Sequence, residues 1–177
     1  MNDLLLQVRG LVTSFQTDDG QVRAVDGVSF EIPKGKTIGL VGESGCGKTV
    51  TAMSIVDLLP KPAGTIQEGE ILFGGEDLRK VGDSRLHEVR GGEIGVIFQE
   101  PMSALNPVHR IGKQLVEAIV LHKKVNKRDA LIRAVELLEK VGIPSPERRV
   151  MDYPHQLSGG MRQRVMIAMA ISCEPQL

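Results

Sequence analysis

The stretch Gly42-Glu43-Ser44-Gly45-Cys46-Gly47-Lys48-Thr49 fits the pattern G-x-x-x-x-G-K-[ST], in which backbone amides surround the phosphates of a nucleotide. The apolar run Thr37-Ile38-Gly39-Leu40-Val41 before it predicts a buried strand, and the residues from Val50 to Leu59 predict a helix. Strand, loop and helix in this order direct several N–H groups and the positive end of a helix toward one anion. A glycine-rich turn that merely caps a helix is the alternative, and the preceding strand disfavours it. The stretch therefore predicts a binding site for ATP or GTP.

Two side chains of this loop carry the expected chemistry. Lys48 is expected to reach the β- and γ-phosphates, and the Thr49 hydroxyl is expected to ligate Mg²⁺. Cys46 lies inside the loop, where a disulfide would obstruct the ligand, and Cys173 is the second of the two cysteines. A reducing compartment is therefore expected.

Composition narrows the class of protein. The 177 residues suffice for one sizeable domain, and 22 Lys plus Arg balance 22 Asp plus Glu. Because these charges balance, the chain has no net positive field to attract nucleic acid. Because it has no Trp and one Tyr, it also lacks an aromatic platform on which bases could stack. Asp3 and Arg9 bracket a short alternating stretch rather than the apolar core of a signal peptide, and the apolar run 165–171 is too short to span a bilayer. Membrane association is expected only through a partner.

Alternation predicts antiparallel strands before the loop, over 4–8 and 28–32, with Thr17-Asp18-Asp19-Gly20 as a hairpin turn. Another short strand is expected over 70–73. The run Ile94-Gly95-Val96-Ile97-Phe98 suits a central strand that ends at Gln99.

Helical spacing follows in two segments. One apolar face comprises Ile111, Leu115, Ile119 and His122; the other comprises Leu131, Ala134, Val135, Leu138 and Val141. Asn126 is a plausible cap of the second helix and Gly142 its stop. The four histidines, His87, His109, His122 and His155, are best interpreted as surface or loop residues.

A second candidate anion site is Leu157-Ser158-Gly159-Gly160-Met161-Arg162-Gln163, just before a helix whose apolar stripe contains Met161, Val165, Ala168 and Met169. Ser158 is a good N-cap, and the two glycines leave the first-turn N–H groups bare. Taken alone, this could be an ordinary serine-capped helix.

The stretch from Leu157 to Gln163 resembles the signature sequence of ATP-binding cassette (ABC) ATPases, and the whole chain matches that family in order. Gln99 resembles the family's Q-loop glutamine, although alone it could be a polar residue at a strand end. Phe15 resembles the aromatic residue that stacks on adenine, although it could equally be a core residue of a small sheet. The stretches 98–107 and 153–164 are similar to dipeptide/oligopeptide/nickel importers.

The resemblance implies a role for each matching position. Ser158, Gly159, Gly160 and Gln163 would bind ATP held by a second ABC ATPase subunit in a head-to-tail dimer. Thr49 and Gln99 would lie at Mg²⁺, and residues 100–157 would contact membrane permease subunits at the cytoplasmic face of the plasma membrane. ATP would be bound in cis by Phe15, Gly42, Glu43, Ser44, Gly45, Cys46, Gly47, Lys48, Thr49, Val50 and Gln99.

The implied fold is the α/β P-loop ABC-ATPase fold, C-terminally incomplete. It would consist of an antiparallel β subdomain (1–35), a P-loop core with a parallel sheet (36–99), a helical subdomain (100–157) and the signature helix (158–177). In the family, the Walker B aspartate, the catalytic glutamate and a switch histidine come later than Leu177. We therefore expect a truncated chain that is poorly stable and does not hydrolyse ATP by itself.

The resemblance implies a subunit that couples ATP binding and hydrolysis to import of peptides or nickel. A different class is a hydrolysis-deficient nucleotide-binding fragment that pairs with or regulates an intact subunit. A third class is a soluble ABC protein of DNA repair or translation. Such proteins usually carry long insertions or a basic surface, which disfavours this class here.

Overall fold

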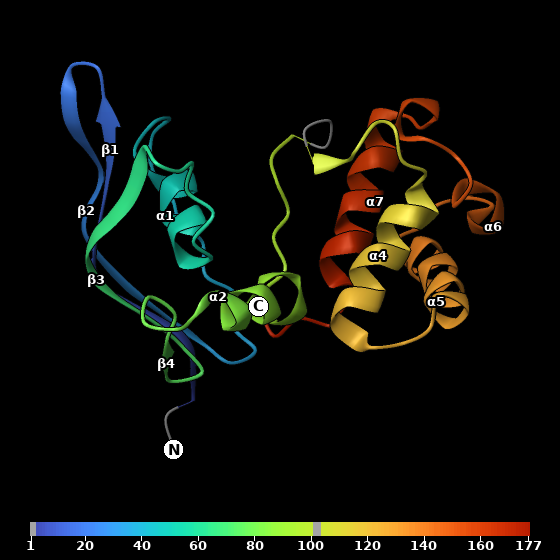
Figure 1. The fold of residues 1–177 in the computed structure, drawn as a ribbon, viewed down its shortest axis with the longest axis horizontal. Helices are drawn as coiled ribbons and strands as arrows, with labels where there is room; N and C mark the ends of the chain where they lie inside the picture. Colours follow the sequence, from blue (N-terminus) through green and yellow to red (C-terminus); the bar gives the residue numbers. More distant parts are fainter. Residues whose placement is uncertain (1–2, 101–103) are drawn as a thin grey trace. The chain divides into compact units, whose positions relative to one another are not determined.

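The structure is a computed structural model that describes residues 3–100 and 104–177. The chain divides into two compact units, Met1–Leu86 and His87–Leu177, and each is described by itself (Figure 1). Residues 101–103, which belong to the stretch predicted to contact a permease, lie outside the described residues.

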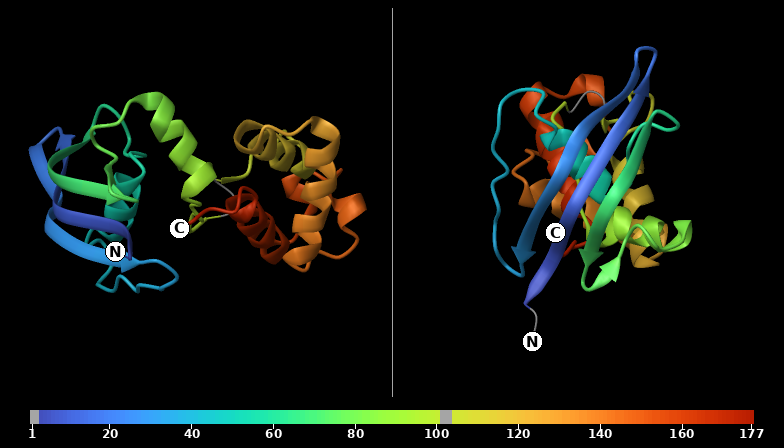
Figure 2. Two further views of the ribbon diagram at one scale, coloured as in Figure 1. Left: turned by 90° about the horizontal axis from the view of Figure 1, so that it is seen from below. Right: turned by 90° about the vertical axis from the view of Figure 1, so that its left-hand side faces the viewer.

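A four-stranded antiparallel sheet forms most of the first unit. Its strands are β1 (Leu4–Thr17), β2 (Gly20–Pro33), β3 (Gly64–Phe73) and β4 (Glu76–Asp77), and their order is β2-β1-β3-β4. The three long strands lie side by side in Figure 2. The predicted hairpin turn and the antiparallel strands are confirmed, and the strands are longer than the alternating stretches indicated.

Strand β1 is the centre of this sheet because it pairs with β2 on one side and β3 on the other. Leu6, Val8 and Leu11 are each no more than 1% exposed, and their neighbours Leu5 and Val12 on the strand are buried as well. A strand with apolar residues at successive positions suits a place with both faces covered.

Helix α1 (Lys48–Ile55) packs against the sheet through buried hydroxyl groups. Ser54 and Thr13 of β1 share a hydrogen bond of 2.9 Å, and Ser54 also donates to the carbonyl of Val50. The helix begins and ends earlier than the range 50–59 that the sequence predicted. It ends early because Asp57 adopts a left-handed conformation, φ 48°, which is incompatible with a continuing helix.

The predicted buried strand over 37–41 is wrong in this structure. The segment has no regular secondary structure and pairs with no strand among the described residues, and Val41 is 91% exposed. A strand forms only when a neighbouring strand pairs with its backbone groups, and the described sheet contains no strand beside this segment. The parallel core sheet of the expected fold is therefore not formed by the described part of the chain.

Short helix α2 (Asp83–Glu88) and an irregular turn (Val89–Glu93) precede the predicted strand 94–98, which is not a strand either. Only its beginning is paired: the Leu177 N–H donates to the Glu93 carbonyl at 3.2 Å, and the Gly95 N–H donates to the Leu177 carbonyl at 2.8 Å. Ile97 is 51% exposed. The remaining backbone groups have no partner strand in the part of the chain that the structure describes.

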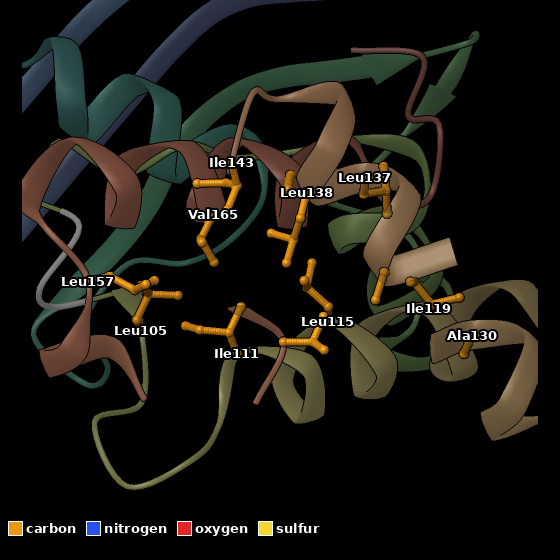
Figure 3. Close-up of a cluster of buried hydrophobic side chains, with 13 residues drawn as sticks. Leu105, Ile111, Leu115, Ile119, Ala130, Leu137, Leu138, Ile143, Leu157 and Val165 are labelled. Atoms are coloured by element: carbon orange, nitrogen blue, oxygen red, sulfur yellow. The ribbon is translucent and has the colours of Figure 1, made fainter. Parts of the chain in front are cut away.

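The second unit is built from helices around one apolar core. These are α4 (Ile111–Lys123), α5 (Lys127–Lys140), α6 (Pro146–Arg149) and α7 (Gly159–Ile171), with a single turn at Pro154–Gln156. Figure 3 shows Ile111, Leu115 and Leu138 meeting in the cluster that these helices enclose.

The predicted helix ends of this unit are confirmed. The Asn126 side chain accepts a hydrogen bond from the Asp129 N–H at 3.0 Å, and Gly142, at φ 75°, follows the end of α5. Ser158 caps α7. Leu131 is a wrong prediction, because it is 43% exposed and the buried face of α5 instead includes Ala130 and Leu137.

Candidate nucleotide-binding site

The glycine-rich loop leads directly into α1, whose first residue is Lys48. Gly45 and Gly47 adopt φ of 83° and 91°, a left-handed conformation that glycine takes without steric cost. This geometry turns the chain sharply at the helix start, where the first backbone N–H groups have no carbonyl partner within the helix. The loop therefore ends in a group of donors suited to an anion.

The Lys48 ammonium group lies over its own loop. Its Nζ atom donates to the carbonyl oxygens of Gly42 at 2.9 Å and Glu43 at 2.7 Å, and it lies 3.5 Å from the Cys46 sulfur. In the described chain, no carboxylate forms an ion pair with this ammonium. The positive charge is thus held at the loop and is available to an incoming phosphate.

The helix start packs against β2 and β1. A side chain at position 47 would overlap the carbonyl oxygen of Ala24 in β2. Only glycine at this position therefore allows the loop to approach β2 so closely. Thr51 donates both its N–H, at 2.8 Å, and its hydroxyl, at 3.0 Å, to the Gly47 carbonyl. Together with the hydroxyl pair between Thr13 and Ser54, these contacts hold the first-turn N–H groups of α1 in place.

Thr49 is one of the two residues expected to ligate Mg²⁺. Thr49 is exposed in the first turn of α1, next to the half-buried Val50. Among the described residues, no three His, Cys, Asp or Glu side chains are grouped so that they could hold a metal ion. A hydroxyl ligand beside phosphates suits Mg²⁺, which usually binds through few protein groups and the oxygens of the nucleotide.

The predicted adenine-stacking residue Phe15 lies near the end of β1, where it pairs with Val22 and Gly64. Its half-buried ring covers Gly64, since a side chain there would lie 2.9 Å from the Phe15 ring. Gln99, the second residue expected at Mg²⁺, is exposed and belongs to the second unit.

The signature residues lie at the start of α7 in the second unit. The Ser158 hydroxyl accepts a hydrogen bond from the Met161 N–H at 3.3 Å, while Gly159, Gly160 and Gln163 are exposed. Side chains added at either glycine would meet no atom within 4 Å. The glycines thus leave open space where side chains would lie, beside first-turn N–H groups that have no carbonyl partner within the helix.

A cleft of about 390 Å³ beside α1 has no counterpart in the sequence motifs. Its lining includes Asp57 and Lys61, which form an ion pair at 3.0 Å, and Arg79, which donates to the Ile66 carbonyl. Burial alone would raise the pKa of the adjacent Asp77 carboxyl, but hydrogen bonds from Lys80 and two backbone N–H groups lower it overall. The lining comes from separate segments, so no sequence pattern indicated this cleft.

Comparisons with known proteins show what the whole chain is similar to. The family described as "ABC transporter" matches residues 25–177. The oligopeptide transport ATP-binding protein OppD of Bacillus subtilis (strain 168) is 53% identical over 173 residues, covering 98% of this chain and 48% of that protein. The dipeptide transport ATP-binding protein DppD of the same organism is 50% identical over 173 residues, covering 98% of this chain and 52% of that protein. The chain thus spans about half the length of the curated relatives it matches.

Solved structures show the same fold. A dimeric bacterial ABC transporter cassette, MJ0796, superposes with a TM-score of 0.83 at 24% identity and covers 96% of this chain and 70% of that chain. A second structure of MJ0796, described as bound to ADP and Pi, gives a TM-score of 0.84 at 24% identity, with the same coverage. The expected ABC-ATPase fold class is confirmed. The chain belongs to the ABC transporter family.

Proposed function

We propose that this chain is the ATP-binding part of a transporter that uses ATP to import peptides. The observation that carries this proposal is the loop from Gly42 to Thr49, packed closely on β2 at Gly47, with a Lys48 ammonium that forms no ion pair with a carboxylate in the described residues. The relatives are named oligopeptide and dipeptide transport proteins, which supports peptides as the cargo.

Within one protomer, the backbone N–H groups of residues 42–50 would hold the phosphates, with Lys48 between the β- and γ-phosphates. The Thr49 hydroxyl and Gln99 would hold Mg²⁺, which when bound neutralises charge that develops on the phosphates. Phe15 would stack on adenine.

A second ATPase subunit would close over the nucleotide with its own signature residues. In this proposal Ser158, Gly159, Gly160 and Gln163 bind the γ-phosphate of ATP held by that subunit, in a head-to-tail dimer. Their support is the start of α7, a helix of 13 residues that Ser158 caps and whose first two glycines leave open space where side chains would lie.

A permease would contact residues 100–157 of the helical unit. A groove of about 710 Å³ runs along α4, and its lining is mainly apolar. Lys113 and Lys127 contribute two positive charges to this lining against the single carboxylate of Glu117, so an amphipathic helix with acidic residues would fit. Val116, Val120 and Leu121 supply the apolar surface.

The assembly would lie at the cytoplasmic face of the plasma membrane, organised as a β subdomain (1–35), a P-loop core (36–99), a helical subdomain (100–157) and the signature helix (158–177). In the described residues, no helix combines enough length with enough apolar character to cross a membrane.

A matched pair of substitutions at Gly160 tests the trans site. Gly160→Asp adds a carboxylate where nothing lies within 4 Å, and an acidic group suits a helix N-terminus, so folding should be retained. The carboxylate should repel phosphate, whereas Gly160→Ala adds only a methyl group. ATP binding to single protomers, measured by titration calorimetry, should be equal in both variants. ATP-dependent association, measured by sedimentation, should be lost in Gly160→Asp alone. Equal association of both variants would contradict the trans site.

A further inference from the structure

The segment that leads into the signature sequence is bound to the first turn of α4. The Ile111 N–H donates to the Asp152 carbonyl at 2.9 Å, and the Gly112 N–H donates to the Val150 carbonyl at 2.8 Å. A side chain at Gly112 would lie 2.8 Å from that same Val150 oxygen, so glycine is required for this approach. Backbone donors at the start of α4, which an isolated helix would leave unpaired, are thus used to hold residues 150–152.

Tyr153 continues this attachment through its side chain. The Arg110 guanidinium carbon lies 5.7 Å from the centroid of the Tyr153 ring, within the range of a cation–π contact. The His155 ring stacks on Tyr153 with 5.6 Å between centroids and 12° between planes. The Tyr153 N–H donates to the Gln156 side-chain oxygen at 2.8 Å, which closes the turn that follows.

The far end of this turn is the signature serine. Leu157 is 3% exposed and belongs to the apolar core of the second unit, so the chain is anchored directly before Ser158. Between Tyr153 and Leu157 the chain forms one tight turn with little freedom of its own. Because only this turn separates the two residues, a displacement of Tyr153 from Arg110 would shift Leu157 in the core and with it the cap of α7.

We propose that Tyr153, held by Arg110 and Gln156, is a positioning residue that sets the orientation of Ser158. The proposal rests on the proposed function, because Ser158 is expected to bind the γ-phosphate held by a second subunit. Tyr153 itself needs no contact with nucleotide. It transmits the position of the first turn of α4 to the start of α7.

Amide hydrogen exchange of the whole chain without nucleotide tests the positioning directly. In Tyr153→Leu and Arg110→Ala, the amides of residues 157–161 should exchange about two- to fivefold faster, the effect expected when one exposed cation–π contact is lost. Tyr153→Phe keeps the ring and should behave as the wild type. The control Arg128→Ala removes an exposed arginine of α5 and should change nothing. Amides of α5 serve as the internal reference for intact folding.

Tyrosine emission gives an independent readout, because Tyr153 is the one tyrosine and the chain has no Trp. Emission should change in Arg110→Ala and not in Arg128→Ala, even if Tyr153→Leu fails to fold. ATP-dependent association should weaken in Arg110→Ala by a similar factor, while ATP affinity of the protomer stays constant. Unchanged exchange of residues 157–161 in Arg110→Ala, or a Tyr153→Phe variant that exchanges as fast as Tyr153→Leu, would overturn the positioning role. A wild type that shows no ATP-dependent association, with the exchange pattern intact, would instead reject the proposed trans site.

Discussion

Gly47→Ala should destabilise the first unit more than the same substitution at Gly45, two residues earlier in the loop. Both glycines have positive φ, 91° and 83°, so alanine at either position adopts a left-handed conformation at a cost of about 1–2 kcal/mol. At Gly45 the new methyl group meets no atom within 4 Å. At Gly47 it overlaps the carbonyl oxygen of Ala24, which belongs to β2 and cannot turn away as a flexible side chain could.

The difference between the two variants is therefore an overpacking cost, about 1–3 kcal/mol. With a urea dependence of about 2 kcal/mol per molar, Gly47→Ala should lower the unfolding midpoint of α1 and β1 by about 0.5–1.5 M relative to Gly45→Ala. Hydrogen exchange at increasing urea concentration should measure the unfolding midpoint of the first unit separately from that of the second. The amides of α5, in the second unit, should be unaffected by either substitution. Equal midpoints for the two variants would refute the close approach between the loop and β2.

Two further predictions address the second unit. Leu138→Ala truncates a fully buried side chain of α5 and should lower the free energy of unfolding, measured by urea titration, by about 2–5 kcal/mol. Leu131→Ala on the exposed face should change it by no more than about 0.5 kcal/mol. Similar losses in the two variants would show that the buried face of α5 is misassigned. Hydrogen bonds from Lys123 and Arg133 hold the pKa of the Glu174 carboxyl below its usual range, so this carboxylate stabilises the fold above the unfolded pKa of about 4.3. That stabilisation is lost as pH falls through the lowered folded value, so wild type and Glu174→Gln should differ in thermal unfolding near neutral pH and converge in acid. A constant difference at every pH would contradict the ion pairs.

Local signals in the sequence predicted the parts of the fold that depend on neighbouring residues. Asn126, Gly142 and Ser158 mark helix ends through contacts within one turn, and all three act as predicted. The hairpin of β1 and β2 likewise depends on a two-residue turn at Asp18-Asp19 and on alternation along each strand.

Features that depend on distant partners were not predictable in this way. The apolar segments 37–41 and 94–98 have the composition of buried strands, yet a strand exists only when another strand pairs with it. Leu131 and Leu138 both lie at helical spacing in α5, and tertiary contacts alone decide that Leu138 is buried. The attachment of Tyr153 to Arg110 joins residues remote in sequence and has no motif.

Within the candidate site, the motif predicts a phosphate loop over residues 42–49, and the structure adds how this loop is held against β2. The contact between Gly47 and β2 and the hydroxyl pair of Thr13 and Ser54 involve residues outside the motif. These contacts depend on how β1 and β2 pair residue by residue, and the loop motif carries no information on that register.

The central claim is that the loop from Gly42 to Thr49 binds nucleotide phosphates, and Lys48→Ala tests it most directly. Titration calorimetry with Mg-ATP should compare the wild type, Lys48→Ala and the control Lys36→Ala, which removes an exposed lysine of the same unit. Loss of a charged hydrogen bond worth about 1.5–3 kcal/mol predicts an affinity lower by about tenfold to a hundredfold for Lys48→Ala alone. An affinity equal to that of the wild type would contradict the account.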